Sequence, residues 1–159
     1  MRHRRLPRLD LPGHTYALTC CIHARRRLLE TPDLAEKLIG LFAEARDRGD
    51  ILLHGYVVMP DHYHVVLTLK EGLPVSHLIR RIHSAFARAA KRQLRTTDRV
   101  WQERFYDHVI RNHEDWLEQV EYMHANPVRA GIVDDPVLYR WSSCRFWEAG
   151  DAPLRCDPP

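Results

Sequence analysis

Two histidines, His62 and His64, are separated by one residue within an otherwise apolar stretch, residues 55–69. In a β-strand, residues i and i+2 point to the same side of the sheet. The sequence therefore predicts that both imidazoles project from one face, while Tyr63, Val65 and Leu67 project from the other. Paired imidazoles on one face of an apolar strand indicate a metal site; the alternative is a pair of hydrogen-bonded histidines on a half-buried strand.

Tyr122 and Asn126 stand four residues apart near the end of a predicted helix, which Pro127 terminates. Both side chains should share one face of that helix, roughly 6 Å apart along its axis. Two imidazoles and one amide oxygen, with open positions for phosphate and water, suit Mg²⁺ or Mn²⁺ better than a closed zinc site. The alternatives are a core aromatic at Tyr122 and a simple helix terminator at Asn126. The candidate metal ligands are therefore His62, His64 and Asn126, and the candidate nucleophile is Tyr122.

The chemistry of a tyrosine nucleophile explains why a metal should lie nearby. A phenol with a pKa of about 10 attacks poorly at neutral pH unless a cation is close and the charge of the phosphate is neutralised. Attack by Tyr122 on a DNA phosphodiester, in line with a departing 3′ oxygen, yields a 5′-phosphotyrosine and a free 3′ hydroxyl. Because the covalent bond conserves the phosphodiester energy, the predicted reaction is strand transfer rather than hydrolysis.

The pattern of apolar and turn-forming residues predicts an α+β domain. The expected elements are a strand over residues 16–22, a helix from 31–33 to Gly49, hairpin strands over 51–59 and 62–69, a helix after 74–76, a strand over 105–110 and a helix over 114–125. This βαββαβ order is that of a ferredoxin-like antiparallel sandwich, with an extra C-terminal helix that carries Tyr122. We expect one domain over residues 1–144, including a basic N-terminal arm, and a partly disordered tail over 145–159.

Basic residues are concentrated in two segments, although the net charge of the chain is only +3. Such clusters are typical of proteins that bind the phosphate backbone, and a solvated helix face is the alternative interpretation. The candidate backbone contacts are Arg2, Arg4, Arg5 and Arg8 in the N-terminal arm and Arg80, Arg81, Arg88, Lys91 and Arg92 in the second helix.

The sequence also predicts a cytoplasmic protein without membrane association. No window approaches the roughly 18 consecutive apolar residues of a membrane span, and the basic N-terminus lacks the apolar run of a signal peptide. The four cysteines form no C-x-x-C pair, which favours reduced thiols over a zinc or disulfide framework.

Four blocks of sequence together resemble the HUH superfamily of single-strand DNA nucleases, in particular the REP-associated relatives of the single-tyrosine insertion-sequence transposases. The blocks are Gly55-Tyr-Val-Val-Met-Pro-Asp-His-Tyr-His64, Val100-Trp-Gln-Glu-Arg-Phe-Tyr-Asp-His-Val-Ile-Arg111, Tyr122-Met-His-Ala-Asn-Pro-Val-Arg-Ala-Gly-Ile-Val133 and Tyr139-Arg-Trp-Ser-Ser143. By resemblance, the metal-binding histidines are His62 and His64, the nucleophile is Tyr122, and the third metal ligand is Asn126. One departure is Asp61, where many relatives have asparagine; its carboxylate either adds metal affinity or caps the hairpin turn.

The resemblance implies a bacterial, nucleoid-associated protein that recognises imperfect DNA hairpins of repetitive extragenic palindromes (REP). A short single-stranded guide sequence beside the hairpin foot belongs to the implied substrate, and the single strand is cleaved. A monomer is favoured, with a homodimer as the alternative. The rival functions are a relaxase-like nickase, which is expected in a longer multi-domain chain, and a hairpin-binding regulator that does not cut.

Overall fold

A computed structural model describes residues 13–150 and 154–159 of the chain. Its antiparallel sheet has four strands in the order β2-β3-β1-β4. The strands are β1 (Thr15–Cys21), β2 (Ile51–Met59), β3 (His62–Leu69) and β4 (Tyr106–Val109). The helices are α1 (Pro32–Asp47), α2 (Val75–Leu94), α3 (His113–His124), α4 (Asn126–Arg129) and α5 (Cys144–Ala149). Three short 3₁₀ turns complete the set: η1 (His23–Arg25), η2 (Leu28–Glu30) and η3 (Pro136–Leu138).

The predicted α+β, ferredoxin-like order of elements is confirmed. Strands β2 and β3 have the predicted bounds and form a hairpin through a turn at Pro60 and Asp61. Helix α3 begins after Asn112, whose side chain accepts a hydrogen bond from the backbone of Asp115 at 2.9 Å. Asparagine is one of the residues preferred at this N-terminal capping position. Among the described residues, no helix is both long and apolar enough to cross a bilayer.

The described parts of the segment expected to be a partly disordered tail have defined contacts. Its first residues are helical in α5. Near the chain end, the Asp157 carboxylate accepts two hydrogen bonds of 2.8 Å from the Arg46 guanidinium and one of 2.9 Å from the Leu53 backbone. These bonds hold the last residues against the edge strand β2 and α1, at a sequence separation that local patterns do not reveal. Residues 1–12, with the predicted basic arm, lie outside the described part of the chain.

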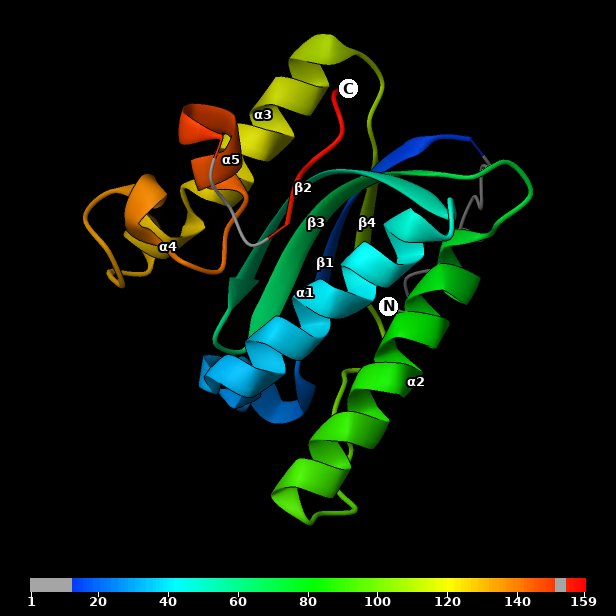
Figure 1. Ribbon diagram of the computed structural model, residues 1–159, viewed down its shortest axis with the longest axis vertical. Coiled ribbons are helices and arrows are strands. Elements are labelled where there is room, and N and C mark those ends of the chain that lie inside the picture. Colours follow the sequence, from blue (N-terminus) through cyan, green and yellow to red (C-terminus); the bar gives the residue numbers. More distant parts are fainter. Residues whose placement is uncertain (1–12, 151–153) are drawn as a thin grey trace, which may run out of the picture.

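The two faces of β3 point into different surroundings, as its alternation predicts. Tyr63 and Val65 enter the main core, where α1 and α2 cover the sheet side by side (Figure 1). Val66 belongs to a second, smaller core on the opposite face, and His62 and His64 share that face. The histidine pair therefore lies on the side of the sheet that α1 and α2 do not cover.

Helix α2 is amphipathic, which fixes the side on which its charges lie. Leu78, Ile82 and Phe86 recur at helical spacing and are buried in the main core. Basic side chains occupy the remaining surface, including the exposed Arg80 and Arg88. The burial of the apolar stripe thus determines which way the cations face.

Helix α3 packs on the opposite face, against β2 and β3. Trp116, Val120 and Met123 of this helix join the smaller core. The approach is closest at Gly55 of β2, where an added Cβ would lie 2.7 Å from the Cε atom of Met123 and 3.3 Å from the Oγ atom of Ser143. The missing side chain at Gly55 lets α3 lie close to the sheet.

Replacing Gly55 with valine should therefore destabilise the protein by about 1–3 kcal/mol, because the added methyl groups overlap Met123 and Ser143. The free energy of unfolding in urea measures this effect. Gly40→Ala within α1 is the matched control: a Cβ there meets no atom within 4 Å, so alanine should stabilise the helix by about 0.5–1 kcal/mol. A Gly55→Val protein as stable as the parent would contradict the close packing of α3.

Candidate active site

His62 and His64 lie next to each other on β3, with ring centroids 4.9 Å apart and ring planes at 87°. Each ring is held through its Nδ1 atom. Nδ1 of His62 lies 2.6 Å from Oδ1 of Asp61, and Nδ1 of His64 lies 2.8 Å from Oγ1 of Thr19, its neighbour in register on β1. In both rings Nε2 is thus the nitrogen left for another ligand.

Nε2 of His64 is buried and has no hydrogen-bond partner among the described residues. Burial, and to a smaller extent the charges of His62, Arg129 and Arg25, lower the pKa of His64 to about 3. A ring that is neutral and donates from Nδ1 carries its lone pair on Nε2. Buried nitrogens without a partner are costly, and a neutral imidazole held through its other nitrogen is the form that binds metals. The site therefore fits a divalent cation.

Asp61, whose role the sequence leaves open, contacts the imidazole of His62. Its second carboxylate oxygen lies 3.0 Å from Nε of Arg25. A carboxylate bonded to the far nitrogen of a metal-binding histidine fixes the ring and increases the basicity of the ligand. The geometry therefore favours an influence of Asp61 on metal affinity through His62.

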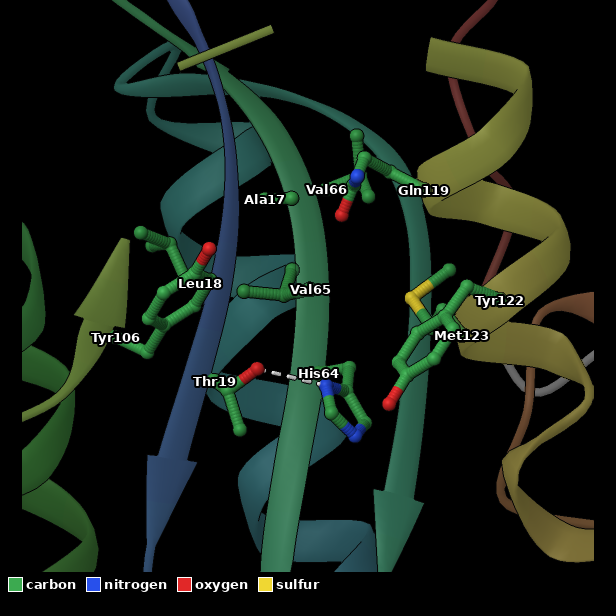
Figure 2. A pocket seen from close by; sticks show the side chains of 10 residues that line it. All are labelled: Ala17, Leu18, Thr19, His64, Val65, Val66, Tyr106, Gln119, Tyr122 and Met123. Atoms are coloured by element: carbon green, nitrogen blue, oxygen red, sulfur yellow. Dashed lines mark hydrogen bonds between the residues drawn. The ribbon is translucent and has the colours of Figure 1, made fainter. Parts of the chain in front are cut away.

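Tyr122 is 57% exposed, so the alternative of a core aromatic is wrong. Its ring centroid lies 6.5 Å from that of His64, with the ring planes at 89°. Figure 2 shows the phenol extending from α3 to the side of His64. The structure thus places the ring of Tyr122 beside that of His64.

Arg129 is a site residue that the sequence patterns did not single out. Its guanidinium carbon lies 3.9 Å from the ring centroid of Tyr122, and its Nη2 donates to the Tyr122 carbonyl at 2.6 Å. The signal for it is the seven-residue spacing from Tyr122, which is two helical turns. Contact of a guanidinium with the face of an aromatic ring is attractive, so Arg129 restrains the phenol and brings positive charge to the site.

Asn126 begins α4 directly after α3 ends. Its Nδ2 atom donates to the carbonyls of Tyr122 and Met123, at 3.2 Å and 3.3 Å. It therefore supports the end of α3, as the terminator interpretation expects, while its Oδ1 atom is not used in these bonds. Within residues 13–150 and 154–159, no three His, Cys, Asp or Glu side chains form a metal-binding group. A third protein donor beside the histidines must be of another type, and Asn126 stays the predicted candidate.

Helix α3, which carries the phenol, is fixed near both ends. Near its start, the Asp115 carboxylate accepts a hydrogen bond from Nε2 of His108 on β4, at 2.8 Å. At its end, the buried Nε2 of His124 lies 2.9 Å from Oγ of Ser143, which also bonds the backbone of Tyr56 on β2. These contacts set the position of Tyr122 over the sheet.

A cavity of about 410 Å³ lies beside Tyr122 and His64 on the same face of the sheet (Figure 2). Its floor comes from β1 and β3, including Ala17. Helix α3 forms one wall with Gln119 and Tyr122, and Tyr106 of β4 contributes to the other. The cavity thus opens next to the candidate nucleophile.

The predicted DNA contacts do not gather at Tyr122. The described members of the set are Arg80, Arg81, Arg88, Lys91 and Arg92, all on α2. That helix covers the face of the sheet opposite to the histidines. Arg81 forms an ion pair with Asp50, whereas Arg80 and Lys91 line a groove between α2 and residues 99–105. The remaining predicted contacts, Arg2, Arg4, Arg5 and Arg8, lie outside the described residues.

A ferredoxin-like sheet with paired histidines on an inner strand and a tyrosine-bearing helix beside them is the arrangement of a tyrosine-transposase domain. Residues 11–124 match the family model described as transposase, IS200-like. The chain belongs to this family of transposases.

Individual relatives agree with this assignment. The chain is 32% identical over 127 residues to the REP-associated tyrosine transposase of Escherichia coli K12, covering 79% of this chain and 73% of the relative. The solved structure of a REP-associated tyrosine transposase bound to a REP hairpin matches with a TM-score of 0.74 and 28% identity, over 98% of this chain and 92% of the other. A crystal structure from Deinococcus radiodurans R1, with 18% identity and a TM-score of 0.54 over 75% of this chain and 95% of the other, is similar in fold alone.

His124, which contacts Ser143 at the end of α3, makes the free energy of unfolding depend on pH. Burial lowers the pKa of His124 to about 4 from its ordinary 6.5. Between these values the unfolded chain binds more protons than the folded chain, so this contribution to stability is present above about pH 6.5 and is lost as the pH falls towards 4, on the order of 1 kcal/mol per pH unit. In urea unfolding followed against pH, His124→Gln should be less stable at pH 7 and have a shallower acid dependence.

His77→Gln is the matched control for this measurement, because His77 is exposed on α2. It should retain the acid dependence of the parent. Equal slopes for His124→Gln and the parent would show that His124 does not stay neutral in the folded protein.

Proposed function

We propose that this transposase-family protein is a metal-dependent single-strand DNA endonuclease and strand transferase that cuts beside REP-type hairpins through Tyr122. The observation that carries the proposal is an exposed phenol next to the buried, partnerless Nε2 of His64. Membership of the IS200-like family supports DNA as the substrate. A related tyrosine transposase bound to a REP hairpin supports the hairpin as its recognised form.

The proposed donors to a divalent cation, Mg²⁺ or Mn²⁺, are Nε2 of His62, Nε2 of His64 and Oδ1 of Asn126. A mixed nitrogen and oxygen set that leaves room for phosphate and water suits these cations. When bound, the cation supplies Lewis-acid neutralisation of charge on a non-bridging phosphate oxygen. Asp61 and Thr19 hold the two rings, so that their Nε2 atoms are preset before DNA arrives.

In the proposed step, Oη of Tyr122 forms a bond to phosphorus while the bond from phosphorus to the 3′ oxygen breaks. The phenolic proton passes to solvent, which reaches this exposed side chain, and the departing oxygen takes up a proton to become a free 3′ hydroxyl. The 5′ phosphate stays on Tyr122 as a diester. Attack by another 3′ hydroxyl reverses the step and joins strands without a nucleotide cofactor.

Arg129 has two proposed effects on this step. Its stacking on the ring limits the orientations of the phenol, and its charge lies where the anionic phosphate must approach. The carbonyl contact of Arg129 also links α4 to the end of α3. Arg129 is thus proposed to position both reacting groups.

The basic residues of α2 and of the N-terminal arm are proposed to contact the hairpin backbone. The histidines and Tyr122 already meet within one chain, which supports a monomer as the complete catalytic unit. A homodimer is the alternative, and light scattering in solution distinguishes the two.

Labelled single-stranded hairpin DNA incubated with the protein and Mg²⁺ or Mn²⁺ should form a covalent adduct on a denaturing gel. Tyr122→Phe keeps the ring beside Arg129 but lacks the attacking oxygen, so adduct formation should fall on the order of a thousandfold or more. A gel-shift assay checks that this variant still binds the DNA. Binding by the parent protein without any adduct would instead support the hairpin-binding regulator that does not cut.

The proposed metal site can be tested separately, without DNA, by measuring the affinity for Mn²⁺ with isothermal titration calorimetry. Asp61→Asn keeps the size of the side chain but removes the charge that holds His62, and should weaken Mn²⁺ binding about 10- to 100-fold. Asp98→Asn is the matched control, since Asp98 is exposed and pairs with Arg26 away from the histidines. Unchanged affinity in Asp61→Asn would remove Asp61 from the proposed site.

A further inference from the structure

The cavity beside Tyr122 has features that attack on a phosphate does not require. Tyr106, at the start of β4, is 66% exposed although it is a large aromatic side chain. Figure 2 shows its ring lying alongside β1, across the cavity from the side chains of α3. Ala17 lies on the floor, where its small side chain leaves room. An exposed aromatic wall above a flat floor is suited to a planar ligand.

The sheet register places Tyr106 at a defined distance from the nucleophile. Tyr106 pairs with Thr19 on β1, and Thr19 pairs with His64 on β3. Two strand spacings, about 9–10 Å, therefore separate the backbones of Tyr106 and His64. A nucleotide whose phosphate lies at Tyr122 and His64 can extend its base towards Tyr106 over this distance.

Gln119 supplies a polar group to the same cavity. It precedes Tyr122 by three residues on α3, so the two side chains share one face of the helix. Its amide reaches over the sheet into the cavity (Figure 2) and makes no hydrogen bond to another side chain of the described residues. An amide that both donates and accepts can read the edge of a nucleobase.

The approach to the cavity is also suited to a DNA strand. Residues 99–103 and Phe105 line the groove with Arg80 and Lys91 of α2, and the chain continues from Phe105 directly to Tyr106. A backbone held at this groove reaches Tyr106 where it crosses the β4 edge of the sheet. Tyr106 thus lies between the basic face and the nucleophile.

We infer that the cavity binds a single unpaired nucleobase, that of the nucleotide adjoining the scissile phosphate, stacked on Tyr106 and read at its edge by Gln119. The inference rests on the proposed function for the position of the phosphate. A base within a duplex is stacked on both faces and cannot offer itself to Tyr106, so the ligand is single-stranded DNA.

The test measures binding rather than cutting, in a Tyr122→Phe background that leaves the DNA intact. Fluorescence anisotropy follows hairpin DNA whose single-stranded flank carries one abasic position at a time. Stacking on an aromatic ring corresponds to about 5- to 150-fold in affinity per base. One abasic position should weaken binding within this range, and the same position should carry no penalty once Tyr106→Ala is added.

Further variants separate stacking from a general loss of structure. Tyr106→Phe keeps the ring and should retain the abasic penalty. Ala17→Leu fills the floor and should weaken binding of intact DNA but not of the abasic DNA, and Gln119→Leu should change which base is preferred at that position. Leu138→Ala, an exposed apolar residue on η3 away from the cavity, should leave every penalty unchanged. Urea unfolding shows that each variant is folded.

Abasic penalties that are the same with and without the ring of Tyr106 would overturn the nucleobase site. This binding measurement does not depend on whether the parent protein cuts DNA. A ring-dependent penalty in a protein whose parent forms no adduct would support the base site and refute the proposed cleavage. An adduct without a ring-dependent penalty would support cleavage and refute the base site.

Discussion

The alternation of side chains along β3 is the constraint on which the rest of the molecule depends. As an inner strand, β3 pairs with β1 on one side and β2 on the other, and its two faces enter two different interiors. Tyr63 is fully buried in the main core, where its hydroxyl bonds His83 of α2 at 3.0 Å, while His64 faces α3. A slip of one residue in register would exchange the faces and place both histidines in the apolar core. The hydrophobic burial that fixes the register of β3 therefore also fixes the face on which the imidazoles lie.

The site combines a buried candidate metal ligand, Nε2 of His64, with an exposed candidate nucleophile, Tyr122. Both residues lie where α3 packs on the sheet. The approach of this helix at Gly55 brings Met123 close to the sheet. On the same face of the sheet, the pKa of His64 falls to about 3 because burial disfavours its charged form. The ring then stays neutral, as a metal ligand must, throughout the physiological range. One residue before Met123, the side chain of Tyr122 is more than half exposed beside His64, which leaves it accessible to the proposed DNA substrate. The rotation of about 100° between consecutive helical residues is enough to separate the two environments.

Local periodicity predicted the features that depend on neighbouring residues. Alternation gave the bounds of β2 and β3 and the shared face of the histidines, and the helical spacing before Pro127 placed Tyr122 on a helix. Contacts between distant segments were not predictable in this way. The Thr19–His64 bond requires the register of β1 with β3, and the contact of Arg129 with Tyr122 crosses the boundary between α3 and α4. The position of α2 behind the sheet depends on how its apolar stripe packs, whereas its charge alone suggested only that it binds DNA.

The separation of the basic helix from the nucleophile affects which DNA the proposed reaction can use. The groove between α2 and residues 99–105 and the cavity at Tyr122 lie on opposite faces of the sheet. Phe105 lines the groove and the next residue, Tyr106 of the edge strand β4, lines the cavity. DNA that contacts both must turn around this edge within a few nucleotides. Duplex DNA is too stiff for such a turn, since its persistence length is about 150 base pairs, whereas an unpaired strand bends freely. If α2 holds a hairpin stem, as proposed, only the single-stranded flank of that hairpin can reach Tyr122. The proposed preference for single strands then follows from the sheet lying between the two sites rather than from the chemistry of the phenol.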